Sequence, residues 1–205
     1  MDAQKLQLKI FVTPDSARAL DLEVFIPVFH RWIKDHVLPE LVIDVANYLH
    51  VPQGPGVVLI GHGSDYFMDE GADQGVRRPG LLHNRKRSGP GPADRLGDLA
   101  RRTLHAALLL EKEPSLAGKL RFAPGELLLR INDRLAAPSS DATLTALRPE
   151  IDALASRLFG GPVDLTRVGG PKDPFGVRLS SSTTQSLATL LERAGGPPGP
   201  DASVV

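Results

Sequence analysis

The stretch GVVLIGHGSDYF, residues 56–67, places chemically capable side chains directly after an apolar run. His62, Ser64 and Asp65 interrupt the run before Tyr66 and Phe67 resume it. Histidine, serine and a carboxylate are the residue types of nucleophilic catalysis, and imidazoles also bind zinc. The two flanking glycines allow a different interpretation, in which a strand packs closely beneath a bulky group.

A hairpin explains the position of these residues. If residues 41–51 and 56–67 pair around the PQGPG loop with Val51 opposite Val57, then Ala46 lies opposite His62. Because side chains alternate along a strand, Gly61 and Gly63 then face the first helix. The opposite face becomes a polar-aromatic face that collects Asp44, Tyr48, His50, His62, Ser64 and Tyr66.

This face could carry a catalytic triad or a metal site. Ser64, His62 and Asp44 are the types of a catalytic triad, but the sequence has no strand-turn-helix nucleophile elbow. His50 and His62 lie about 13 Å apart at ~3.3 Å per residue, too far to share one metal ion. His62 and His83 come closer if the next strand runs alongside. Neither site is favoured, and we expect no catalytic residue, no metal ion and no cofactor.

A local basic cluster follows. Its members could hold a phosphate, but lysine plus arginine (24) equals aspartate plus glutamate (24), so no overall field favours nucleic acid. No nucleic-acid motif accompanies the cluster, and a solvated charged loop is the favoured interpretation. The cluster consists of Arg77, Arg78, His83, Arg85, Lys86 and Arg87.

Composition sets further bounds. The chain has 205 residues, 41% of them hydrophobic, and can bury a substantial core. The absence of cysteine excludes disulfides, thiolate metal sites and cysteine nucleophiles. No basic segment followed by a long apolar run opens the sequence, and no stretch approaches the roughly 18 apolar residues of a membrane span. We expect a cytoplasmic protein without a membrane partner.

The elements that must position these residues follow from periodicity. The first half predicts a strand at 5–12, an amphipathic helix within 23–38, the hairpin of 41–51 and 56–67, a third strand at 80–86 and a helix at 94–112. The second half predicts a strand at 126–133, a helix from 141 to about 159, a hairpin of 163–168 and 175–180, and a helix to about 193 that Ser182 or Thr183 caps.

The shared order of the two halves predicts an α+β fold. Each half reads strand, helix, hairpin, helix, which suggests an internal duplication packed as a pseudo-two-fold pair. The expected units are 1–112, including the extra strand 80–86, and 119–195, and within the first unit the linker RSGPGPA, residues 87–93, precedes the helix at 94–112. A disordered tail, 196–205, follows.

Several runs in both halves resemble a family of bacterial proteins that are uncharacterised and have no assigned function. The runs are FIPVFHRWI, VPQGPGVVLIGH with the following DY, GLLHNRK, and INDRLAAPSSDATLTALRPE. The resemblance would cover nearly the whole chain. It implies a self-standing cytoplasmic bacterial protein and brings no activity, cofactor or site residue.

The sequence therefore predicts a non-catalytic binding or self-assembly protein. Aromatic and histidine side chains on a flat sheet face suit a protein interface, so a protein partner or a second copy is expected to cover it. The alternative is a domain or enzyme that binds a small anionic ligand on the face of His62, Asp44 and Tyr66, with Arg85 or Lys86 as anchor. The candidate binding or interface residues are Asp44, Tyr48, His50, His62, Ser64, Tyr66, His83, Arg85 and Lys86.

Overall fold

The computed structural model describes residues 5–52, 54–73, 76–86, 94–182 and 185–199, and its centre is one antiparallel sheet of eight strands. The strand order is β2-β3-β4-β7-β1-β8-β10-β9, and β5 and β6 pair separately as a short ribbon. The strands are β1 (Leu6–Val12), β2 (Val42–Asn47), β3 (Val57–Gly61), β4 (Ser64–Asp69), β5 (Ala72–Asp73), β6 (Val76–Arg77), β7 (Gly80–Arg85), β8 (Phe122–Ile131), β9 (Asp164–Val168) and β10 (Phe175–Ser180).

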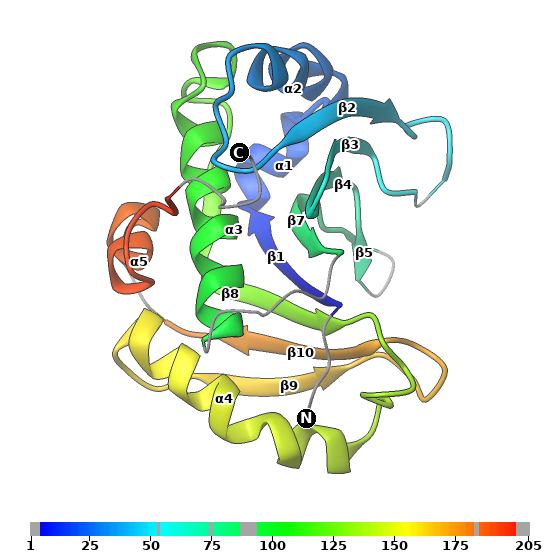
Figure 1. Ribbon diagram of the computed structural model, residues 1–205, viewed down its shortest axis with the longest axis vertical. Coiled ribbons are helices and arrows are strands. Elements are labelled where there is room, and N and C mark those ends of the chain that lie inside the picture. The colour runs from blue at the N-terminus through cyan, green and yellow to red at the C-terminus, as the bar shows by residue number, and fades with distance from the viewer. Residues whose placement is uncertain (1–4, 53, 74–75, 87–93, 183–184, 200–205) are drawn as a thin grey trace.

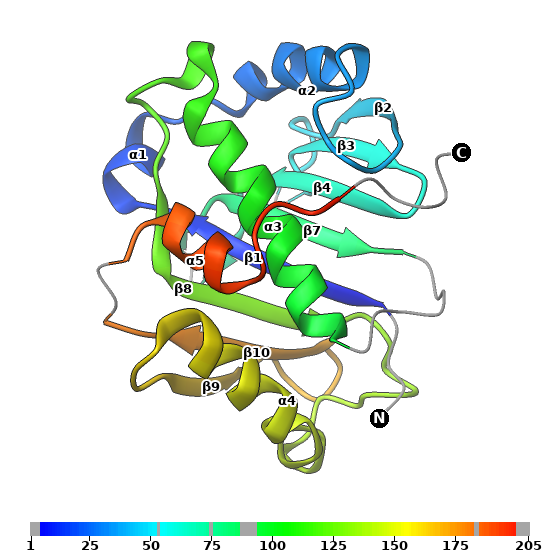
Figure 2. The same cartoon turned by 60° about the vertical axis from the view of Figure 1, so that its left-hand side comes forward.

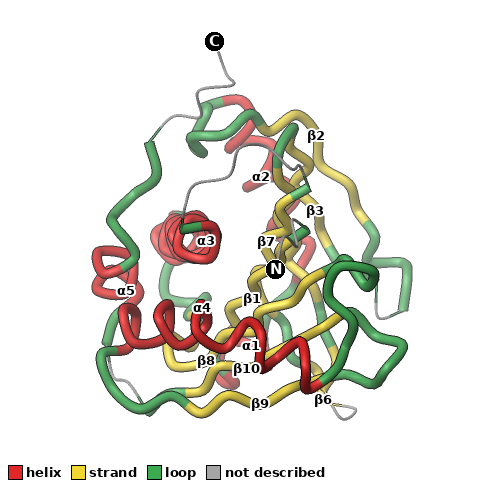
Figure 3. The backbone as a smooth tube through the Cα atoms, turned by 60° about the horizontal axis from the view of Figure 1, so that its bottom comes forward, coloured by secondary structure: helices red, strands yellow, loops and turns green. Residues whose placement is uncertain are grey.

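The helices are α1 (Pro14–Ala19) beyond the end of β1, α2 (Phe25–Lys34), α3 (Arg95–Lys112), α4 (Asp141–Phe159) and α5 (Leu187–Arg193). Helices α2 to α5 pack against strands of the sheet, which confirms the mixed α+β class (Figure 1). The helix α3 runs across β1 and β7, while α5 packs against both α3 and α4 (Figure 2). A view nearly along α3 shows α3 and α5 on the concave side of the curved sheet (Figure 3).

Two single turns of 3-10 helix, Leu22–Val24 and Pro114–Leu116, complete the described elements. Among these elements there is no helix with the length and apolar character needed to cross a lipid bilayer.

Capping residues fix most helix starts where the sequence indicates them. The Asp94 carboxylate accepts the Gly97 N–H (2.9 Å) at the start of α3, and Ser140 caps α4 through the Thr143 N–H (3.2 Å). For α5 the predicted cap is wrong. Ser186, rather than Ser182, accepts the Thr189 N–H (3.2 Å), and Thr183 lies outside the described residues.

The core lies between the helices and the inner face of the sheet. Strand residues of β1, β7, β8 and β10 that face the helices, such as Leu8, Leu81, Leu129 and Val177, are fully buried in one continuous cluster. The central pairing of β1 with β8 joins the two ranges that the sequence suggests as units, so both contribute to the same sheet and core.

The two hairpins occupy different places in the sheet. The second hairpin, β9–β10, lies directly beside β8, the first strand of its half. The first hairpin, β2–β3, is separated from β1 by β4 and β7. Residues 5–66 and 125–180 therefore differ in strand order, and the structure does not show the internal duplication that the sequence pattern suggested.

The opening stretch is a hairpin, whereas a single strand was expected. The chain reverses at His62 and Gly63, so β3 ends at Gly61 and β4 begins at Ser64. Because of this reversal Tyr66 lies opposite Leu59, on the face that the helices cover. The register of β2 also differs from expectation, since Ala46 lies opposite Val58 and not opposite His62.

The loop between β2 and β3 is longer than PQGPG, and this explains the register. The loop moves the pairing by four residues, an even number, so Asp44 and Ala46 keep the face that alternation predicted.

The chain remains ordered at the start of the expected disordered tail. Gly195 has a positive φ of 106°, and the Gly196 N–H donates to Leu191 O (2.9 Å), which ends α5 with a glycine cap. Residues 200–205 of the tail lie outside the described part, as do residues 87–93, which include the expected linker.

Candidate functional site

The candidate residues do not form one surface, because the sheet separates them. Ser64, Tyr66 and His83 are buried, the last two at 1% exposure, and Tyr66 and His83 point to the helices. The prediction that Ser64 and Tyr66 lie on the outer, polar-aromatic face is therefore wrong. The cause is the turn at residues 62–63, because β4 begins a new strand at Ser64. Asp44, Tyr48, His50 and His62 are exposed, and Arg85 and Lys86 are half-buried.

The buried residues belong to a polar cluster in the core. The rings of Tyr66 and His83 stack, and the Tyr66 hydroxyl hydrogen-bonds to the Glu40 carboxylate. His83 Nδ1 lies 3.2 Å from Thr103 Oγ1, which itself donates to Leu99 O (2.7 Å). His83 Nδ1 is therefore the donor in the first contact. Burial lowers the pKa of His83 to about 3, which makes it a neutral structural residue near pH 7.

The exposed residues lie at two ends of β2. The His62 N–H donates to Leu41 O (2.9 Å) before the strand, and the Tyr48 N–H donates to Gly56 O (2.8 Å) after it. Tyr48 stacks on His50 with a centroid separation of 6.4 Å. No set of three or more histidine or acidic side chains in the described part of the chain could hold a metal ion.

The basic cluster is dispersed by separate partners. Arg77 donates to the carbonyls of Ala17 (2.8 Å) and Leu20 (3.1 Å), and Lys86 pairs with Asp65 (2.8 Å). Arg87 is not among the described residues. The remaining members therefore do not converge on one phosphate-sized position.

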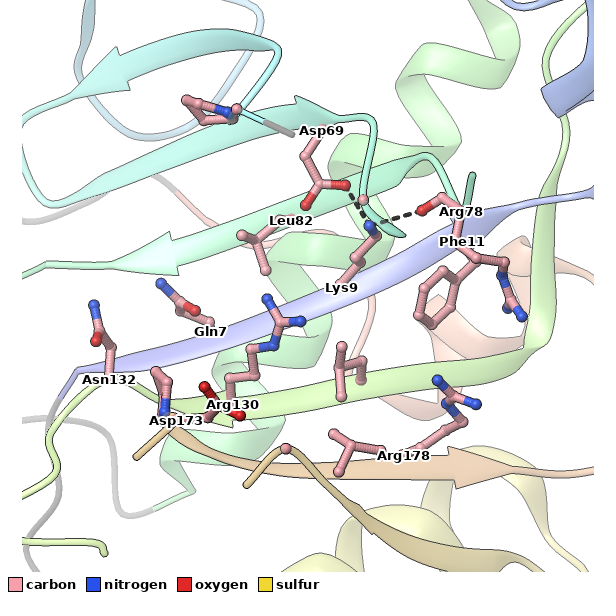
Figure 4. A pocket seen from close by; sticks show the side chains of 17 residues that line it. Gln7, Lys9, Phe11, Asp69, Arg78, Leu82, Arg130, Asn132, Asp173 and Arg178 are labelled. Carbon is pink, nitrogen blue, oxygen red and sulfur yellow. Dashed lines mark hydrogen bonds and ion pairs between the residues drawn. The ribbon is translucent and has the colours of Figure 1, made fainter. Parts of the chain in front are cut away.

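The outer face of the sheet carries a groove instead, with a volume of about 640 Å³ (Figure 4). Its floor consists of β7, β1, β8 and β10. Its rim includes Gly54 and Pro55 from the β2–β3 loop and Gly169, Asp173 and Pro174 from the β9–β10 turn. These two loops join strands at opposite edges of the sheet, so the curvature of the sheet brings both edges to one site.

The floor is built from two rows of side-by-side residues. Strand registers place Lys9 between Leu82 and Leu128, and Leu128 beside Arg178. The adjacent row places Gln7 between Asn84 and Arg130, with Gly176 on the far side of Arg130. The first row is thus largely apolar, and the second is polar.

A buried ion pair closes one end of the groove. Lys9 Nζ contacts the Asp69 carboxylate and donates to Arg78 O (2.9 Å). Burial lowers the pKa of Lys9 and raises the pKa of Asp69, since both charges have left water. Gly71, with a φ of 45°, passes so closely that an added Cβ would lie 2.4 Å from Lys9 Nζ. The backbone of this glycine therefore covers the lysine.

Two arginines of the groove share one carboxylate. Arg78 contacts Glu126 (2.5 Å) and places its guanidinium 4.5 Å from the centre of the Phe11 ring. Arg178 Nε lies 3.4 Å from the other oxygen of Glu126. Glu126 therefore neutralises part of the positive charge at this end.

Arg130 differs from the other cations of the groove. Its side chain is half-buried and, within the part of the chain that the structure describes, makes no hydrogen bond or ion pair. Figure 4 shows it standing over β1 between Gln7 and Lys9. Its positive charge adds to the lowering of the Lys9 pKa by burial and opposes the rise that burial gives the Asp69 pKa. Among the described residues of the groove, no carboxylate pairs with this guanidinium.

The groove was not predicted from the sequence. The alternation in KLQLKIFV places Gln7, Lys9 and Phe11 on one face of β1, and the same rule places Leu128 and Arg130 on one face of β8. The alternation can be read from the sequence, but the pairing of β1 with β8 cannot, because the paired residues lie 110 or more positions apart. No family model, no curated protein and no solved structure matches the chain, so its function must be argued from this geometry.

Proposed function

We propose that the protein binds a small anionic ligand in the groove and that the Arg130 guanidinium anchors it. The observation that carries this proposal is a half-buried guanidinium that lines the groove and has no partner among the described residues. A half-buried charge has lost part of its contact with water, and a carboxylate or phosphate that accepts two guanidinium hydrogen bonds compensates for that loss.

The dimensions and lining support binding of a small molecule. About 640 Å³ is within the range of ligand pockets, roughly 300–1,000 Å³. Apolar side chains (Leu82, Leu128) and polar ones (Gln7, Arg130) share the floor, as such pockets require. The function class is the alternative that the sequence suggested, an anionic-ligand site, but at residues other than Asp44, His62 and Tyr66.

Calorimetry with a panel of small anions tests this proposal. Arg130→Gln is expected to weaken binding by about tenfold or more, because a charged hydrogen bond contributes roughly 1.5–3 kcal/mol. Arg148→Gln is the matched control, since Arg148 is an exposed arginine on α4 whose contact is with Asp152. Equal anion binding by Arg130→Gln and the unaltered chain, or no anion binding by either, would contradict the proposal.

A self-contact at the edge strand β2 is a second candidate. The described part of the chain exposes five large apolar side chains, and four of them belong to residues 41–51. They are Leu41 (41% exposed), Ile43 (56%), Tyr48 (42%) and Val51 (40%). Exposed apolar patches at the rim of a sheet favour association with another chain. This supports the assembly class that the sequence suggested, limited to the residues that are exposed.

Light scattering over a range of protein concentrations tests the second candidate. Replacing Ile43 and Tyr48 together with lysine is expected to lower the native mass, because an unpaired lysine at an interface is costly. Leu135→Lys is the control, since Leu135 is 98% exposed and follows β8, which is not a neighbour of β2 in the sheet. A chain that is monomeric before and after the double change would eliminate this candidate.

A further inference from the structure

We infer that the ligand of the groove is an amphipathic monocarboxylate: one carboxylate at Arg130 and an apolar chain or ring over Leu82 and Leu128. This inference rests on the proposed function and adds the chemical class of the ligand. It follows from three features of the site: the number of charges that are already engaged, the apolar row beside Arg130, and the second Gln7 N–H next to the guanidinium.

The charges of the groove leave room for a single negative charge. Its cations are Lys9, Arg78, Arg130 and Arg178, and Lys9 is paired with Asp69. Glu126 contacts both Arg78 and Arg178. Asp173 adds a third carboxylate at the rim, where it accepts the Gly170 N–H (2.6 Å). Four positive groups therefore meet three carboxylates, and a dianion would be repelled by Asp69 and Asp173.

The apolar body of the ligand has a defined place. Leu82 and Leu128 line the groove on either side of Lys9, with 8% and 4% of their surfaces exposed, while Lys9 itself is buried. Leu128 precedes Arg130 by two residues on β8, so both side chains project from the same face of that strand. A carboxylate bound at Arg130 can therefore extend its hydrocarbon part over this row.

The carboxylate has a second donor beside Arg130. One Gln7 N–H donates to Asn84 Oδ1 (3.1 Å), which leaves its second N–H for a ligand oxygen. On the other side of Arg130, Gly176 is buried, and the Val168 side chain packs over it. The ligand oxygens are therefore expected on the Gln7 side of the guanidinium.

Calorimetric titrations of the full chain with four probes test this ligand class. Octanoate combines a carboxylate with an apolar chain, acetate and octanol each lack one of these parts, and inorganic phosphate carries more charge without an apolar part. Octanoate is expected to bind about tenfold or more tightly than each of the others, because both halves of the site contribute. Leu128→Ala is expected to weaken octanoate binding, with Leu135→Ala as control. If Leu128→Ala fails to fold, the probe series decides.

The outcomes separate the inference from the proposed function. Octanoate binding that exceeds the other probes and requires Arg130 supports both. Phosphate or acetate binding that equals octanoate binding and is lost in Arg130→Gln overturns the inference and leaves the proposed function standing. Octanol binding that equals octanoate binding also overturns the inference. Binding of no probe, or binding that Arg130→Gln does not alter, overturns both.

Discussion

Tyr66 and His83 stack face to face inside the protein, with ring centroids 4.6 Å apart and ring planes 7° apart. The stack adjoins a network in which Glu40 is shared by the Tyr66 hydroxyl and Arg102 (3.2 Å). Arg102 also contacts Asp98 (3.2 Å). Each of these buried charges has an opposite partner, as a buried ionic group requires. The cluster therefore fixes α3 against the sheet and is not an exposed binding surface.

The buried imidazole of His83 predicts that stability falls in acid. The folded-state pKa is about 3, against 6.5 for the unperturbed group. Between these values the unfolded chain binds a proton that the folded chain does not, so the free energy of unfolding decreases as pH falls. The expected contribution is about 1.4 kcal/mol per pH unit, fully present above pH ~6.5.

His83→Phe isolates this effect, because phenylalanine can stack on Tyr66 but cannot bind a proton. Urea unfolding at pH 7 and pH 4.5 is expected to show a smaller acid loss in the variant, with the difference about 2–3 kcal/mol. The carboxylates are the same in both proteins, so their contribution to the acid loss cancels in the difference between the two. Equal losses in the two proteins would show that His83 is protonated in the folded state.

Periodicity predicted the regular elements well. The spacing of Phe25, Phe29 and Trp32 predicted α2, all three are buried, and Asp94 marked the start of α3 as an N-cap does. The alternation of KLQLKIFV predicted β1. These signals are local, because they depend on residues within a few positions of one another.

Strand reversal and pairing were not predictable in the same way. The turn at His62 and Gly63 has a glycine but no Asn-Gly or Asp-Gly signal, so the apolar run resembled one long strand. That single error moved Ser64 and Tyr66 to the wrong face. The groove depends on the pairing of Gln7 with Arg130, which no local pattern specifies.

The two glycines that flank His62 are expected to respond differently to substitution. An added Cβ at Gly61 would lie 2.5 Å from Ser64 O and 2.9 Å from Leu41 O, whereas the Cβ of Gly63 would have no neighbour within 4 Å. Gly61→Val should therefore destabilise by about 1–3 kcal/mol through overpacking, and Gly63→Val by about 0.5 kcal/mol or less. Thermal and urea unfolding measure both.

This expectation corrects the sequence-based one, in which both glycines faced the first helix. The contacts that restrict Gly61 are carbonyl oxygens of neighbouring strands. His62→Ala serves as the control, because His62 is exposed in the turn and its loss should leave the melting temperature nearly unchanged. If Gly61→Val and Gly63→Val lower the free energy of unfolding by similar amounts, the turn does not lie at His62 and Gly63.

The Lys9–Asp69 pair predicts strong coupling between two substitutions. Removing one partner leaves the other charge buried, so Lys9→Met is expected to destabilise by about 3–5 kcal/mol. The double variant Lys9→Met with Asp69→Leu should recover much of this loss, since no unpaired charge remains. A double-mutant cycle from urea unfolding gives the coupling, and additive effects of the two changes would show that the pair is not formed.

Asp44 is expected to protect the edge of the sheet. It lies on the edge strand β2, next to a bulge at Ile43, and its Oδ1 accepts the Val45 N–H (2.8 Å). An edge strand with free backbone donors pairs readily with another chain, and bulges and charged side chains prevent this. Asp44→Ala removes both the acceptor and the charge, and should increase the concentration-dependent mass in light scattering. Asp44→Asn keeps an acceptor for the Val45 N–H and should increase it less. If Asp44→Ala has the mass of the unaltered chain at every concentration, the Val45 N–H does not control pairing at this edge.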